Sequence, residues 1–172
     1  TAIKGIESFG GRTNVKASTS SATGIFQFTD ATWAQVVALD KKSDNPILKD
    51  DGRIDPVQQI RAIQILTNAN ADGLTRVGIE VSPVSLYMSH LLGISSAVAL
   101  LKANKDADPA GLLKPRVISN NAAILDKVSI KAVVAAVKNK LDNGRKISDK
   151  IEKQLALVKP DLTTETAWHK VE

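Results

Sequence analysis

The stretch Ser20-Ser21-Ala22-Thr23-Gly24-Ile25-Phe26-Gln27-Phe28 follows a short N-terminal segment that carries the dipeptide Glu7-Ser8. The apolar residues before Glu7 predict a helix over residues 1–9, and Gly10-Gly11 end it. The loop that follows is rich in Gly, Ser and Thr, and a new helix is expected from Asp30. One carboxylate is thus set beside a serine-rich loop and a glutamine with apolar neighbours.

The rest of the chain is patterned as helices, and no stretch alternates polar and apolar residues as a strand would. Three pairs of residues are typical helix starts, in which a capping side chain precedes the first turn: Thr29-Asp30, Asp55-Pro56 and Ser82-Pro83. We predict an all-α protein with helices at about 30–40, 55–70, 83–92, 95–101, 109–113, 120–125, 129–141 and 148–158. Ser95 or Ser96 is the expected cap of the fourth of these.

The sequence also predicts which side of one helix faces inward and where two helices end. The helix over 55–70 is expected to turn Val57, Ile60, Ile63 and Leu66 inward, and Gly73 should break the chain after it. Asn143-Gly144 is a C-cap signal that should end the helix starting at Ser129. The chain is therefore divided into a first domain, residues 1–141, and a helical C-terminal extension, residues 142–172.

Composition narrows the classes of function. The 172 residues are 43% hydrophobic, enough for one sizeable core, and the net charge is +5. Cysteine is absent, so disulfides and thiol chemistry are excluded, and no apolar run reaches the roughly 20 residues that span a bilayer. Aromatic residues make up only 3%, and the basic residues are scattered along the sequence. We therefore expect no membrane span and no nucleic-acid partner.

The aspartate-rich segment 50–55 superficially resembles a calcium loop, but it lacks the regular alternation and the acidic ligand at the twelfth position. We interpret it as a turn followed by a helix cap. The two histidines, His90 and His169, are too far apart for a local zinc motif. No metal site is predicted.

Three motifs together resemble the lytic transglycosylases of the lysozyme-like superfamily, most closely those of phages. They are Glu7-Ser8, the segment 20–28 with its G-x-F-Q core, and Leu86-Tyr87-Met88-Ser89-His90-Leu91-Leu92-Gly93, which is similar to the family's A-Y-N-A-G helix. His90 falls where most members have tyrosine, and this departure puts the tuning of Glu7 in question. The likeness covers about the first hundred residues.

The resemblance implies a lysozyme-like fold, a substrate and a mechanism. These enzymes cleave the β-1,4 bond between N-acetylmuramic acid and N-acetylglucosamine in peptidoglycan with one acid and no cofactor, and they leave a 1,6-anhydromuramyl product. Glu7 matches that catalytic acid and base. The positions implied to bind substrate are Ser20, Ser21, Gln27, Phe28, Tyr87 and His90.

The phage likeness also implies a virion or lysis protein that acts in the bacterial periplasm or cell wall. Because the chain starts at Thr1, we expect a piece of a larger phage protein whose other parts are further partners.

Three alternatives stay open at this point. A hydrolytic lysozyme on the same fold would need a second carboxylate, for which Asp30 is nearest in sequence. The chain could instead be an inactive structural or ejection module of a virion protein, or a basic helical nucleic-acid binder.

Overall fold

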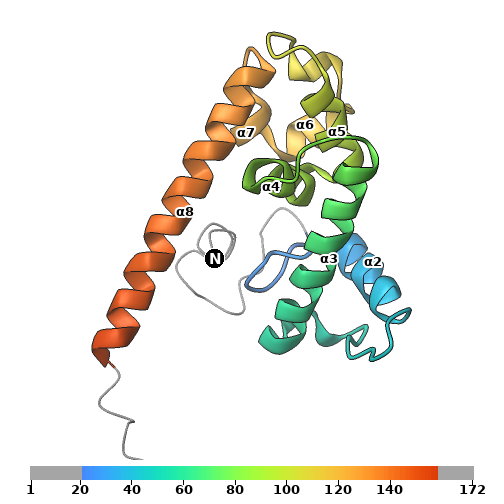
Figure 1. Cartoon of the computed structure of the whole chain (residues 1–172), viewed down its shortest axis with the longest axis vertical. Coiled ribbons are helices and arrows are strands. Elements are labelled where there is room, and N and C mark those ends of the chain that lie inside the picture. The colour runs from blue at the N-terminus through green and yellow to red at the C-terminus, as the bar shows by residue number, and fades with distance from the viewer. Residues whose placement is uncertain (1–20, 159–172) are drawn as a thin grey trace, which may run out of the picture.

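The structure is a computed structural model that describes residues 21–158, with side chains through residue 146 (Figure 1). Within these residues β pairing is limited to one antiparallel bridge, between Thr23 and Phe28, so the all-α prediction is confirmed. The elements in chain order are α2 (Asp30–Asp40), the 3₁₀ helix η1 (Gly52–Ile54), α3 (Pro56–Arg76), α4 (Pro83–Leu92), α5 (Ile94–Lys102), the 3₁₀ helix η2 (Pro109–Gly111), α6 (Pro115–Asn120), α7 (Ala122–Leu125) and α8 (Ile130–Val158).

Three helices begin where their capping residues predict. The Thr29 side chain accepts a hydrogen bond from Thr32 N at the start of α2, and Asp55 accepts one from Val57 N at the start of α3. Ser82 and Ser85 form a reciprocal capping box at the start of α4. These caps satisfy backbone N–H groups that have no partner inside the helix.

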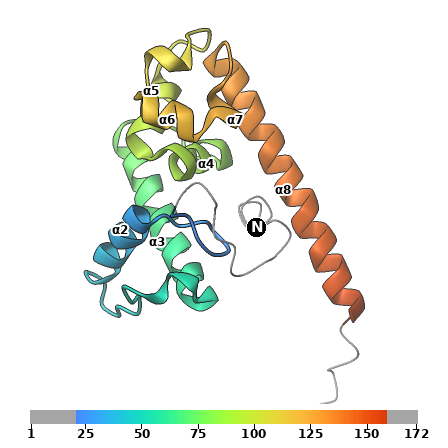
Figure 2. The ribbon, with the colours of Figure 1, turned by 180° about the vertical axis from the view of Figure 1, so that it is seen from behind.

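Apolar side chains gather in two separate clusters, and α3 connects them. One end of α3 packs against α2 and η1, and the other packs against α4 and α5 (Figures 1 and 2). The first cluster is formed by Ile25, Phe26, Phe28, Trp33, Val36, Val37, Leu48, Ala62 and Leu66. The second is formed by Tyr87, Met88, Leu92, Ala97, Leu100, Ile124, Leu125, Ile130, Val133, Val137 and Leu141.

The inward face of α3 differs from the predicted one. Val57 and Ile60 are 68% and 50% exposed, whereas Gln59 is completely buried together with Ala62 and Leu66. The helix also continues through Gly73 to Arg76. The helix has turned a polar amide inward, because the segment packed against it presents backbone groups that need hydrogen bonds.

Helix α8 continues through Asn143-Gly144, so the predicted helix end there is wrong. Val137, Leu141 and Gly144 are buried at helical spacing, so the inward face of the helix reaches the glycine without a break. A glycine inside a helix costs about 1 kcal/mol relative to alanine, and the burial of Val137, Leu141 and Gly144 offsets this cost. The division into residues 1–141 and 142–172 stays a prediction.

The region between α4 and α8 consists of short helices. The predicted helix over 120–125 corresponds to α7, and α6 before it was not predicted. Helix α5 begins at Ile94 with Gly93, rather than Ser95 or Ser96, at its N-cap. Backbone hydrogen bonds from Ile130 N and Lys131 N to the loop after α5 fix the start of α8. Of the helices in the described part of the chain, none combines the length and the apolar character needed to cross a bilayer.

Candidate functional site

The segment that carries the G-x-F-Q motif forms a tight turn between Thr23 and Phe28. The two residues exchange backbone hydrogen bonds of 3.1 Å in both directions, which closes the turn like the end of a hairpin. Gly24 has φ +84°, a left-handed conformation that glycine adopts without steric cost. The motif glycine is therefore required by the backbone of the turn.

Gln27 is the residue that the turn presents. Its φ of +51° is rare for a residue with a side chain, and its amide Nε2 donates a 2.8 Å hydrogen bond to Gly24 O. Gln27 N also donates to Gly24 O, at 3.3 Å. The side chain is half-buried, so one glutamine both closes the turn and remains partly accessible.

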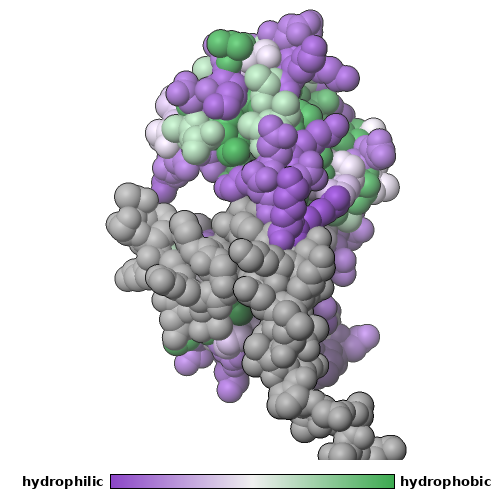
Figure 3. Space-filling view, turned by 90° about the vertical axis from the view of Figure 1, so that its left-hand side faces the viewer, coloured by the Kyte–Doolittle hydropathy of each residue, from purple (hydrophilic) through white to green (hydrophobic). Residues whose placement is uncertain are grey.

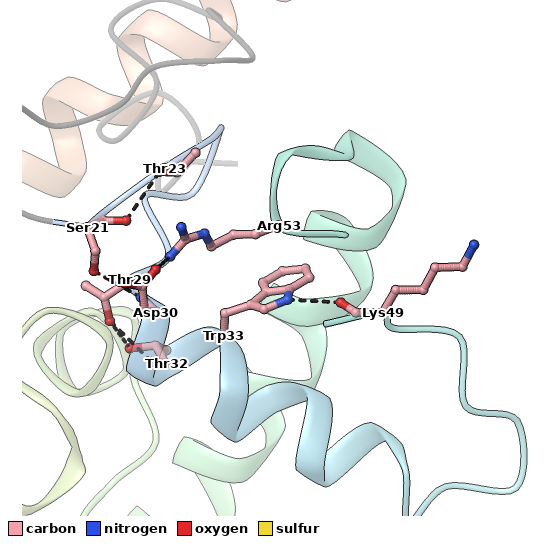
Figure 4. Close-up of polar contacts among 8 residues, drawn as sticks. All are labelled: Ser21, Thr23, Thr29, Asp30, Thr32, Trp33, Lys49 and Arg53. Atoms are coloured by element: carbon pink, nitrogen blue, oxygen red, sulfur yellow. Dashed lines mark hydrogen bonds and ion pairs between the residues drawn. The ribbon is translucent and has the colours of Figure 1, made fainter. Parts of the chain in front are cut away.

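Ser21 lies where the turn meets α2 (Figure 4). Its hydroxyl accepts a 3.1 Å hydrogen bond from Asp30 N, and its carbonyl accepts one from Thr23 Oγ1. Asp30 in turn forms an ion pair with Arg53 of η1. The hydroxyl of Ser21 thus has a local acceptor role at the start of α2.

Phe28 lies inside the first apolar cluster. Its ring is 1% exposed and meets Trp33 edge to face, with ring centroids 5.5 Å apart and an interplanar angle of 73°. The indole Nε1 of Trp33 donates to Lys49 O, which ties the loop before η1 to α2. The position of Phe28 makes it a support beneath the turn.

Tyr87 and His90 form a second group on α4. Their rings stack with centroids 6.2 Å apart, as expected for residues three apart on one helix. Lys140 of α8 places Nζ 5.8 Å from the centre of the Tyr87 ring, a cation–π contact. Tyr87 is fully buried in the second cluster, and His90 is half-buried.

The structure thus places Gln27 and Phe28 in one turn with Ser21 beside it, while Tyr87 and His90 lie on α4 and Tyr87 belongs to the other cluster. Glu7 and Ser20 are outside the described residues. Sequence analysis missed Gln59, whose amide contacts the turn from below. The available signal was its spacing from Ala62 and Leu66, which places all three on one face of α3.

A hollow of about 420 Å³ lies between the first turns of α2 and the segment that contains η1. Its wall includes three carboxylates, but among the described side chains no three metal-ligating groups converge on one point. The aspartate-rich segment instead forms η1 and the cap of α3, as the sequence indicates. The hollow is lined by Asp30, Trp33, Ala34, Asp50, Asp51, Arg53 and Ile54.

No protein-family model matches this chain. A comparison with curated proteins also found no match. The likeness to lytic transglycosylases therefore depends on the three sequence motifs.

Proposed function

We propose that this chain is a lysozyme-like domain that cleaves peptidoglycan glycan strands by the lytic transglycosylase mechanism. The observation that carries the proposal is the turn of residues 23–28. It holds Gln27, the motif glutamine, half-buried in a left-handed backbone conformation. Uncommon backbone conformations of this kind persist where the surroundings enforce them, and they concentrate at functional sites.

In the proposed reaction Glu7 first donates its proton to the glycosidic oxygen, and the bond from that oxygen to C1 of N-acetylmuramic acid breaks. The carboxylate then accepts the proton of the muramyl 6-hydroxyl while the oxygen of that hydroxyl forms a bond to C1. The products are a 1,6-anhydromuramyl end and a free N-acetylglucosamine hydroxyl. Because Glu7 ends as it began, one carboxyl group suffices and no cofactor is needed.

One contact bears on the hydrolytic alternative. A lysozyme would need a second carboxylate near the scissile bond, and Asp30 is the nearest in sequence. Its Oδ1 pairs with the guanidinium of Arg53 at the N-terminus of α2. Transglycosylation needs no second carboxylate, and it is the mechanism that we propose.

We extend the proposal to a phage virion or lysis protein that acts on the wall in the periplasm.

The proposal is tested by mass spectrometry of muropeptides released from purified Gram-negative sacculi. We expect anhydro products from the wild type and a loss of on the order of 10²–10⁴-fold for Glu7→Gln, which keeps the shape of the side chain and removes its proton. Glu80→Gln, at an exposed glutamate before α4, is the matched control and should retain full activity.

Products with reducing ends would show that the protein is a hydrolase and would contradict the transglycosylase mechanism. Release of no products by the wild type would contradict the enzymatic proposal and leave a structural role in a virion.

A further inference from the structure

Gln59 is a completely buried residue of α3. The oxygen and the nitrogen of its side-chain amide each form a hydrogen bond with a backbone group. Its Oε1 accepts a 3.0 Å hydrogen bond from Phe26 N in the turn, and its Nε2 donates a 2.7 Å hydrogen bond to Arg53 O in η1. An N–H can only donate and a carbonyl can only accept, so one orientation of the amide satisfies both partners. Gln59 therefore joins three segments that are separate in the sequence.

The contact with the turn is close as well as polar. A Cβ atom built on Gly24 would lie 1.7 Å from Gln59 Nε2 and 2.5 Å from the amide carbon. The amide thus occupies the space that any side chain at Gly24 would need. Gln59 holds the turn at Gly24 and at Phe26, on the N-terminal side of Gln27.

The amide nitrogen of Gln59 is connected to the turn through a second series of contacts. Arg53, whose carbonyl accepts from Gln59, uses its guanidinium to pair with Asp30. Asp30 N in turn donates to Ser21 Oγ. The contacts form a closed ring through the turn, α3, η1 and the start of α2, so a shift of Gln59 acts on Ser21 as well as on Gln27.

We propose that Gln59 is the positioning residue of the site, which sets where Gln27 and Ser21 meet the glycan strand. This inference rests on the proposed function for its substrate, but the hydrogen bonds that carry it are independent of that function. Gln59 acts through the turn and does not itself touch substrate. A side chain that keeps its volume but loses one of the two hydrogen bonds should therefore impair turnover in a folded protein.

The test is Gln59→Glu, compared with the wild type in the same muropeptide assay across a range of pH. An ionised carboxylate still accepts a hydrogen bond from Phe26 N, but it cannot donate one to Arg53 O. Its second oxygen would instead repel the carbonyl oxygen of Arg53, because both atoms carry negative charge. A protonated carboxyl restores the donor, and burial raises the pKa of a carboxyl toward the accessible pH range. The rate relative to wild type should fall on the order of 10²-fold at neutral pH and recover as the pH is lowered.

The matched control is Gln64→Glu, which makes the same chemical change at an exposed position of the same helix. It should follow the wild type at every pH. Gln59→Met, which keeps the volume and removes both hydrogen bonds, should be slow at every pH without recovery. A wild-type rate and pH profile for folded Gln59→Glu or Gln59→Met would overturn the positioning role.

A second readout separates this inference from the proposed function. In two-dimensional amide NMR spectra, Gln59→Glu should shift the Phe26 backbone and Gln27 side-chain signals, whereas Gln64→Glu should leave both in place. If the wild type releases no muropeptides, the proposed function fails, and these shifts still decide whether Gln59 places the turn. Unchanged signals would overturn the inference whether or not the protein is an enzyme.

Discussion

Asp40 is a buried carboxylate at the end of α2 that organises the loop after it. One oxygen accepts from Ile47 N and Leu48 N, at 2.7 and 2.8 Å, and the other pairs with Arg61 of α3, with Oδ1 2.9 Å from Nη2. Burial alone would raise the pKa of Asp40, but the two backbone donors and the Arg61 guanidinium outweigh it and lower that pKa. The ionised form is therefore the one that the fold stabilises.

We predict that Asp40→Asn lowers the free energy of unfolding by about 2–3 kcal/mol at neutral pH, because the amide gives up charged hydrogen bonds and leaves Arg61 without its partner. The folded pKa is below the unfolded one, so this stabilisation is complete above the unfolded pKa of about 3.9 and is lost as the pH falls through the folded pKa. Urea unfolding of the wild type and Asp40→Asn at several pH values measures this stabilisation.

The difference between wild type and Asp40→Asn should shrink in acid, while Asp44→Asn, at an exposed position of the same loop, should match the wild type throughout. A difference that does not change with pH would show that the charge of Asp40 is not what stabilises the loop.

These residues show which polar roles a sequence reveals. Thr29, Asp55 and Ser82 were predictable because their partners lie two or three positions along the chain. Asp40 and Gln59 were missed because their partners lie 6 to 33 positions away and include backbone groups, which look the same in every sequence. Ser21 and Gln27 could be placed by a motif, whereas the residue that holds them required the tertiary structure.

Among the elements, α8 departs most from its prediction. Asn143-Gly144 has the composition of a helix end, yet the helix runs unbroken from Ile130 to Val158 (Figure 1). The local preference of glycine against a helix is weak, about 1 kcal/mol, and the burial of Val137 and Leu141 in the turns before Gly144 exceeds it. The starts of α2, α3 and α4 were predicted because side-chain caps mark them. The continuation of α8 through Asn143-Gly144 was not predicted, because no side-chain cap decides it.

A proline at Asn143 distinguishes a helix that continues to Val158 from one that ends at Asn143-Gly144. Proline removes an internal hydrogen bond and clashes with the preceding turn, so Asn143→Pro should cost about 3 kcal/mol and lower the helix signal in circular dichroism. Asn143→Ala, at the same exposed position, should instead stabilise by about 0.5 kcal/mol. Tolerance of the proline with full helicity would mean that the helix ends there in solution, as the sequence indicates.

At the scale of the whole molecule, charge divides the described chain into two unlike halves. Residues 21–82 carry six Lys and Arg against eight Asp and Glu, and residues 83–146 carry ten Lys and Arg against four Asp. The ion pairs among the described side chains all lie in the first half. The interpretation of the basic residues as scattered therefore needs correction, because the net positive charge of this part of the protein lies in its second half.

Part of that charge forms a stripe along α8. Lys131, Lys138 and Arg145 are exposed and seven residues apart, which places them on nearly the same side of the helix. Figure 3, which views the molecule from the α8 side, shows hydrophilic side chains down the middle of the coloured part. A polyanionic surface, such as a wall rich in carboxylate or phosphate groups, should meet this half first.

Charge reversal in matched pairs tests this orientation. Lys138→Glu/Arg145→Glu on the stripe and Lys42→Glu/Lys49→Glu in the acidic half change the net charge equally, and all four positions are exposed. On a sulfonate cation-exchange column the stripe pair should lower the salt concentration at elution more than the other pair, because screening limits each charge to about 10 Å at 0.1 M salt. Equal shifts would mean that the protein meets the matrix through its net charge alone and has no preferred basic face.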